Sequence, residues 1–158
     1  MSGAPPVSAR AIDRDSDPIA RTRSFIETYR SVGLPDLREL EALRTILGRA
    51  FHRSLLEASV ESGISSLRYP NDKPPHVEFS FICSDGSYDD YEVAPERFVG
   101  PMVADVVVSF LDRYDGGTYR WKDRYRWVRE GGDWRLADIQ CEIDDPQRSY
   151  SLRASTGH

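Results

Sequence analysis

The sequence predicts an α+β domain in which three N-terminal helices pack on one face of a strongly curved antiparallel sheet. Apolar residues recur every three to four positions from residue 19 to about residue 60, which is the period of a helix. From about residue 76 they alternate, which is the period of a strand, and glycine pairs separate the later strands. Helices first and an antiparallel meander last are typical of this layered class.

The length and charge of the chain limit its organisation and its partners. Its 158 residues fit one domain over 17–145, with a disordered leader over 1–16 and a flexible tail over 146–158. The net charge of −5 argues against a nucleic-acid partner, because phosphate binding needs a positive surface. No apolar run approaches the roughly 20 residues that span a bilayer, and the start lacks the apolar core of a signal peptide. We therefore expect no membrane partner and a cytoplasmic location, unless an export signal has been removed.

Two of the expected helices have a recognisable start. Asp17 is an N-cap residue with Pro18 at the first helical position, and Pro35 and Asp36 open the second helix. The expected helices cover residues 17–33, 35–48 and 51–63. Three prolines and a polar run then predict a loop over residues 64–77.

The second half of the chain predicts strands joined by tight turns. "VEFSFIC" predicts a first strand, and the turn-rich stretch over 84–100 predicts one or two short strands. Three longer strands follow, over 101–114, 119–130 and 134–143. The turns between them contain Gly116-Gly117 and Gly131-Gly132.

The first long hairpin predicts an apolar inner face with one polar misfit. A Gly116-Gly117 loop pairs Val108 with Tyr125 and Phe110 with Asp123. The same face gathers further apolar residues, namely Val106, Trp121 and Trp127. A carboxylate in such a wall must be paired, hydrogen-bonded or neutralised, so Asp123 is the candidate polar group of a pocket.

The second hairpin allows two registers. A loop of two or four residues sets Tyr125 opposite Asp138 and Asp123 opposite Gln140, and we favour this register because it buries Trp134 and Leu136. A three-residue loop or a bulge shifts the pairing by one residue and turns the other set of alternate side chains of the last strand inward, namely Ala137, Ile139, Cys141 and Ile143.

The opposite face of the middle strand carries a basic stripe, consisting of Arg120, Lys122, Arg124 and Arg126. We expect a solvated outer face, with docking of an acidic partner or a second subunit as the alternative. Apolar residues accompany the stripe, namely Val103, Val107, Leu111 and Val128, and they predict a homodimer through this outer face.

Cysteine and histidine give little sign of a metal or nucleophile site. Cys83 and Cys141 are 58 residues apart and are expected to be buried thiols; the alternative is a disulfide, which would imply export. His52 and His76 belong to no triad or metal-ligand pattern and are expected to be structural or exposed. We expect neither a metal nor a cofactor.

The order of elements and the closing hairpin "YRWVREGGDWRLADIQ" resemble the NTF2-like superfamily, which includes SnoaL-like cyclases and ketosteroid isomerases. The segment "YRSVGLPDLRELEALRTILGRAFHRSLLEA" is similar to bacterial DUF3828-type members and to NTF2-fold immunity proteins of toxin systems. The resemblance covers residues 18–144 and implies a cone-shaped fold with a pocket between helices and sheet.

Two functions follow from this resemblance. The favoured one is a non-catalytic binding domain for a small apolar ligand or a protein partner, such as an immunity-type protein, with ligand contacts from Trp121, Trp127, Gln140 and Phe110. The alternative is a lyase, isomerase or cyclase without a cofactor. In that enzyme Asp123 and Asp138 would perform acid/base chemistry, and Tyr125 would donate a hydrogen bond to an oxyanion.

Overall fold

The computed structural model describes residues 17–30, 33–76, 79–83 and 87–156 of the chain. Its elements are α2 (Pro18–Thr28), α3 (Leu37–Leu43), α4 (Arg49–Arg68), β1 (Asp90–Val93), β2 (Arg97–Gly100), β3 (Val103–Tyr114), β4 (Gly117–Glu130), β5 (Asp133–Cys141), β6 (Tyr150–Ser151) and α5 (Leu152–Thr156). The leader predicted over residues 1–16 lies outside the described residues.

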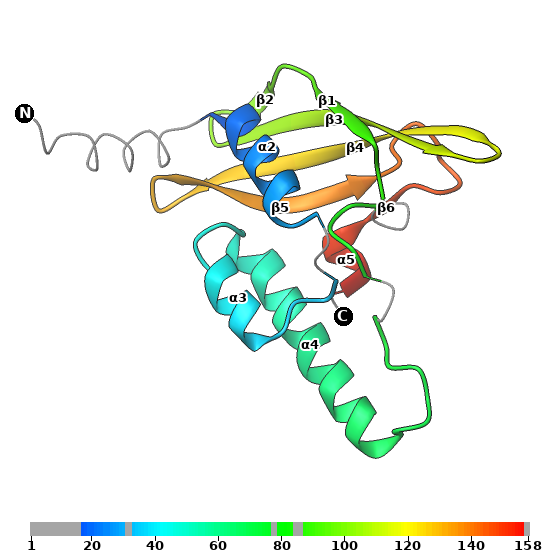
Figure 1. The fold of residues 1–158 in the computed structure, drawn as a ribbon. Helices are drawn as coiled ribbons and strands as arrows, with labels where there is room; N and C mark the ends of the chain where they lie inside the picture. The colour runs from blue at the N-terminus through cyan, green and yellow to red at the C-terminus, as the bar shows by residue number, and fades with distance from the viewer. Residues whose placement is uncertain (1–16, 31–32, 77–78, 84–86, 157–158) are drawn as a thin grey trace, which may run out of the picture.

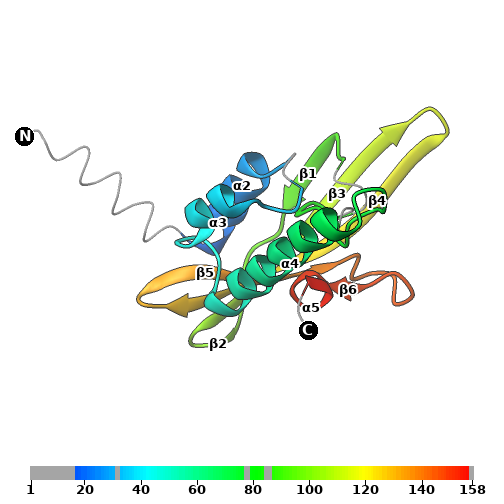
Figure 2. The same ribbon diagram turned by 90° about the horizontal axis from the view of Figure 1, so that it is seen from below.

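The strands form one curved antiparallel sheet, and the helices cover one of its faces. In the described part of the chain the sheet has six strands in the order β1-β3-β4-β5-β6, and β2 pairs with the other end of β3 beside β1 (Figure 1). Seen from below, α2, α3 and α4 all lie in front of the sheet (Figure 2). The predicted α+β class is confirmed. None of the described helices is both long and apolar enough to cross a membrane.

The helix starts follow the predicted caps. Asp17 accepts a hydrogen bond from the Ala20 backbone at 2.8 Å, and Asp36 forms a reciprocal capping box with Glu39. The ends differ from the prediction. α2 stops at Thr28, and α4 continues to Arg68 instead of ending near residue 63. A glycine within a helix costs only about 1 kcal/mol, so its neighbours carry the helix through Gly63.

The first long hairpin has the predicted faces with a shifted register. Val106 pairs with Tyr125, Val108 with Asp123 and Phe110 with Trp121. The loop consists of Asp115 and Gly116 rather than the two glycines, because Tyr114 pairs with Gly117. The cross-strand pairing therefore differs from the prediction by two residues, which changes partners but leaves each side chain on its predicted face.

The second hairpin contains both predicted registers in succession. Gly131 and Gly132 have φ values of 63° and 88°, which a tight two-residue hairpin turn requires. From this turn the pairing sets Trp127 opposite Leu136, but a bulge follows and sets Tyr125 opposite Ile139 and Arg124 opposite Gln140. The favoured pairing of Tyr125 with Asp138 and of Asp123 with Gln140 is wrong. Both alternations of β5 are apolar, and the bulge buries Trp134 and Leu136 before it and Ile139 and Cys141 after it.

The segment before the sheet corrects two further predictions. Residues 79–83 form no strand; Phe81, Ile82 and Cys83 are all buried in succession, which no alternating strand allows, whereas residues 77–78 lie outside the described residues. Cys83 and Cys141 form a disulfide, so the expectation of two free thiols is wrong. This covalent bond fixes the irregular segment to the end of β5.

The C-terminal segment is folded where a flexible tail is expected. Asp138 accepts hydrogen bonds from the Ser151 hydroxyl at 2.6 Å and from the Arg153 backbone at 2.9 Å, at the junction of β6 and α5. Leu152 is 2% exposed. This part of the chain therefore closes the core beside α4 and β5 rather than fraying.

Candidate functional site

Asp123, the polar misfit predicted on the inner face, is fully buried. Its Oδ1 accepts a 2.8 Å hydrogen bond from the Glu142 backbone, and its Oδ2 accepts a 3.2 Å bond from the Trp121 indole. Glu142 has a φ of 51°, an unusual value for a residue with a side chain, just after the end of β5. The carboxyl group is thus held by the surrounding chain, with both oxygens in use.

Burial controls the protonation of this group. The pKa of Asp123 is raised to about 7, chiefly by removal from water and to a smaller extent by the nearby Glu142 carboxylate. Hydrogen bonds from the Glu142 and Cys83 backbones and from the Trp121 indole act in the opposite direction. Near neutral pH the protonated and ionised forms of Asp123 are therefore both populated, although the side chain is not exposed to solvent.

The other predicted pocket residues on this face fill the interior. Trp127 is 0% exposed and donates its indole NH to Thr22 Oγ1 at 2.8 Å. Phe110 and Trp121 stack with ring centroids 5.1 Å apart. Tyr125 is 0% exposed, and its hydroxyl has no hydrogen-bond partner in the described part of the chain. These aromatic side chains pack against one another as core.

The disulfide lies directly beside Asp123. The sulfur atoms of Cys83 and Cys141 and a carboxylate oxygen of Asp123 are all within 4.8 Å of one another. Two thiolates and a carboxylate could hold a soft divalent metal, but sulfurs joined in a disulfide supply no thiolate ligand. In the oxidised protein this trio is a structural element of the core.

Asp138 and Gln140 lie on the outer face, away from Asp123, because of the bulge in β5. Gln140 accepts a 2.6 Å hydrogen bond from Arg124, and Asp138 anchors the C-terminal segment. Arg126 donates two hydrogen bonds of 2.8 Å to the Asp105 carboxylate. Two of the four residues of the basic stripe, Arg124 and Arg126, are thus hydrogen-bonded within the chain. Asp105, which is 7% exposed, is a structural residue that the sequence pattern did not reveal.

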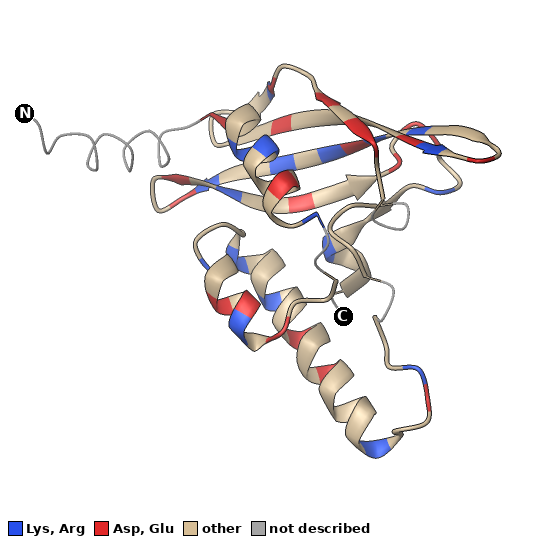
Figure 3. Ribbon diagram, in the orientation of Figure 1, with Lys and Arg blue, Asp and Glu red and all other residues tan. Residues whose placement is uncertain are grey.

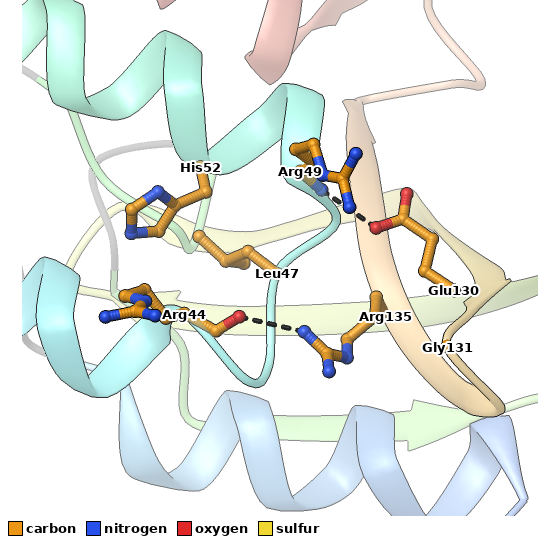
Figure 4. A pocket seen from close by; sticks show the side chains of 7 residues that line it. All are labelled: Arg44, Leu47, Arg49, His52, Glu130, Gly131 and Arg135. Atoms are coloured by element: carbon orange, nitrogen blue, oxygen red, sulfur yellow. Dashed lines mark hydrogen bonds between the residues drawn. The ribbon is translucent and has the colours of Figure 1, made fainter.

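A polar pocket of about 350 Å³ lies where the helices meet the β4–β5 turn (Figure 4). Its lining residues are Arg44, Leu47, Arg49, His52, Glu130, Gly131 and Arg135. Arg135 donates a 2.8 Å hydrogen bond to the Arg44 carbonyl, and Glu130 accepts a 3.1 Å bond from the Arg49 backbone. Figure 4 shows both bonds bridging from β4 and β5 to the helical layer.

Two of the three arginines that line this pocket lie beside acids. Arg44 pairs with Glu41 at 2.9 Å, and Arg135 lies 3.8 Å from Asp133. Glu130 caps the start of α4, which has no side-chain cap from its own N-cap residue. The pocket is therefore best explained as a structural junction that orients α4 against the sheet.

The outer side of α4 carries an apolar groove of about 620 Å³, which we call the α4 groove. Its lining residues are Leu56, Glu57, Val60, Glu61, Ile64, Ser65, Arg68 and Tyr69. Leu56, Val60 and Ile64 are 38%, 49% and 46% exposed. They recur at intervals of four, so they share one face of the helix.

The last two turns of α4 contain no buried residue in the part of the chain that the structure describes. The buried residues of α4 are Phe51, Leu55 and Ala58, all in its first half. Figure 1 shows the C-terminal end of the helix standing well away from the sheet. At the end of the groove Tyr69 is 58% exposed, and Leu67, next to the groove, is 86% exposed. Large apolar side chains gathered on an exposed surface are typical of an interaction site.

The third helix predicted from the sequence ends near residue 63, before the last turns that form this surface. Ile64 continues the four-residue spacing of Leu56 and Val60, and this continuation past Gly63 is the signal that could have revealed the groove.

Comparison with family models, with curated proteins and with solved structures finds no match to this chain.

Proposed function

We propose that this chain is a non-catalytic binding domain of the NTF2-like type, and that its partner is a protein docked on the α4 groove. The single observation that carries the proposal is the row of half-exposed apolar side chains along a helix whose last two turns contain no buried residue among those described. The resemblance of the closing hairpin and the order of elements support the superfamily.

A protein fits the surface better than a small apolar ligand does. The groove is open and lies along more than two turns of a helix, whereas small-molecule sites are concave and enclose most of the ligand. An amphipathic helix that lays its apolar face into the groove would contact Leu56, Val60 and Ile64 together. Such a contact removes from water the apolar surface that the domain leaves exposed.

The isomerase or cyclase alternative draws support from one feature, the pKa of about 7 at Asp123. Acid/base catalysis also needs contact with substrate, and Asp123 and Tyr125 are both 0% exposed. Asp138 faces the other side of the sheet. We therefore propose binding rather than catalysis.

Site-specific photo-cross-linking in the native cells tests this function. A photoreactive residue at Leu67, next to the groove, is expected to form an adduct with a protein that mass spectrometry identifies. The matched control is Leu37 on α3, which is 63% exposed but lies outside the groove. The Leu67 adduct should disappear in a Val60→Glu background. A protein adduct that forms equally at both positions, or no protein adduct at Leu67, would contradict the proposal.

A further inference from the structure

We infer that the protein bound in the α4 groove is a second copy of this chain, with the two α4 helices packed antiparallel about a two-fold axis. This inference rests on the proposed function, because it names the occupant of the same groove. It also moves the expected homodimer contact from the outer face of the sheet to the helical layer.

The charges at the two ends of the groove complement each other under a two-fold rotation. The third charged lining residue, Glu61, lies between them, 3.9 Å from His76 of its own chain. Glu57 lies near the start of the groove and Arg68 at its end. Figure 3 shows acidic positions in the middle of α4 and a basic position at its C-terminal end. Glu57 and Arg68 are eleven positions apart in the sequence, which is roughly 16 Å along a helix. An antiparallel second copy therefore places Glu57 of each chain opposite Arg68 of the other. A parallel copy would instead set like charges beside each other.

The apolar residues fit the same arrangement. With Glu57 opposite Arg68, Val60 of one copy lies beside Ile64 of the other, and Leu56 faces Tyr69. An isologous contact needs one patch that complements itself, and this row supplies apolar contacts on both sides of the axis. Ion pairs at the ends fix the direction of packing more than they strengthen it.

The outer face of the sheet is less suited to a second copy. Its strongest charge pair, Arg126 with Asp105, is already formed within the chain. Its apolar residues Val107, Leu111 and Val128 are partly buried by their own neighbours. Among the described residues, the largest group of exposed apolar side chains on one element lies instead on α4, namely Leu56, Val60, Ile64 and Leu67. A smaller group, Phe98, Val99 and Met102, lies on and just after β2.

The size of the contact predicts a weak dimer. Two helices that meet over three turns bury less than the roughly 1,200 Å² of a standard stable interface. We therefore expect dissociation constants on the order of 10–100 μM, with dimers that form and separate as concentration changes.

Sedimentation velocity of the full chain, from about 5 to about 500 μM, tests the inference. The wild-type protein should shift from the 18.0 kDa monomer toward twice that mass as concentration rises. Val60→Glu should raise the dimer dissociation constant at least about tenfold. Val99→Glu on β2 is the matched control, because Val99 is 51% exposed and lies outside the groove. Circular dichroism checks that both variants are folded.

Charge exchange tests the antiparallel direction. Glu57→Arg and Arg68→Glu should each weaken the dimer at low salt, and the double variant should restore it, because every interchain pair is reversed together. A double variant no better than the singles would overturn the inference, as would a monomer at all concentrations or a dimer unaffected by Val60→Glu. A monomer whose Leu67 cross-links to a different protein overturns this inference alone. A monomer without any protein cross-link overturns the proposed function as well.

Discussion

The indole NH of Trp127 donates a 2.8 Å hydrogen bond to the hydroxyl of Thr22, across 105 residues of chain. Thr22 in turn donates to the Pro18 carbonyl at 2.7 Å. Both side chains are 0% exposed. This relay joins α2 to the middle strand of the sheet, so it fixes one wall of the helical layer.

Replacing this hydroxyl should cost stability. Thr22→Val keeps the shape of the side chain but leaves the buried Trp127 NH without an acceptor, so we expect a loss of about 1–3 kcal/mol in the free energy of unfolding. Urea denaturation measures it. Thr22→Ser keeps the hydroxyl and should cost less than Thr22→Val. Equal stability of Thr22→Val and the wild type would mean that the bond contributes nothing.

Asp123 predicts a pH dependence of stability with a definite sign. Its pKa rises from 3.8 in the unfolded chain to about 7 in the fold, so the folded state holds the proton more tightly. The resulting stabilisation is fully present below about pH 4 and is lost as the pH rises through 7, for a total of about 4 kcal/mol. The free energy of unfolding is measured against pH for the wild type and for Asp123→Asn, and the difference between the two isolates this contribution. A difference that stays constant between pH 4 and 8 would contradict the raised pKa.

Asp123→Ala tests whether the same residue is a hydrogen-bond hub. At pH 5 we expect a loss of about 1–3 kcal/mol, because the Glu142 backbone and the Trp121 indole lose their acceptor. Thermal melts of both Asp123 variants measure the cost. Wild-type stability in both variants would mean that Asp123 contacts water, against its position in the structure.

The disulfide predicts both a chemical and an energetic result. A thiol assay on the unfolded, unreduced protein should find no free thiol, since Cys83 and Cys141 are joined. The bond closes a loop of 58 residues, so its removal in a Cys83→Ala/Cys141→Ala variant should cost about 4 kcal/mol. A disulfide also favours an oxidising compartment. Two free thiols in protein isolated from its native cells would contradict this prediction.

The residues on the inner face of the sheet could be predicted, because a register error of two residues leaves each side chain on the same face of its strand. Asp123, Tyr125 and Trp127 are on the predicted face, although every partner across the first hairpin is shifted. The bulge in β5 could not be predicted. Both alternations of that strand are apolar, so the sequence pattern favours neither face, and packing of Trp134 and Ile139 in one core selects the bulge.

The α4 groove and the Cys83–Cys141 disulfide could not be predicted from local sequence patterns. Gly63 predicts the end of a helix, but α4 continues through it. A helix that ended at Gly63 would not include Ile64, which completes the groove. The pairing of Cys83 with Cys141 depends on how an irregular segment packs beside β5, which no spacing rule specifies. Asp138 and Gln140 would face the pocket only in the register that the bulge reverses.

Tyr125 provides a final test of whether the interior is sealed core. Its hydroxyl is buried without a hydrogen-bond partner in the described part of the chain, and burial raises the pKa of this phenol well above 10. An unpaired buried hydroxyl costs stability, so Tyr125→Phe should raise the free energy of unfolding by about 1 kcal/mol. Trp121→Phe is a useful contrast, since it removes a donor that is in use and should be destabilising. If Tyr125→Phe instead lowers stability, the hydroxyl has a partner, such as a bound water or ligand, and the interior holds a site after all.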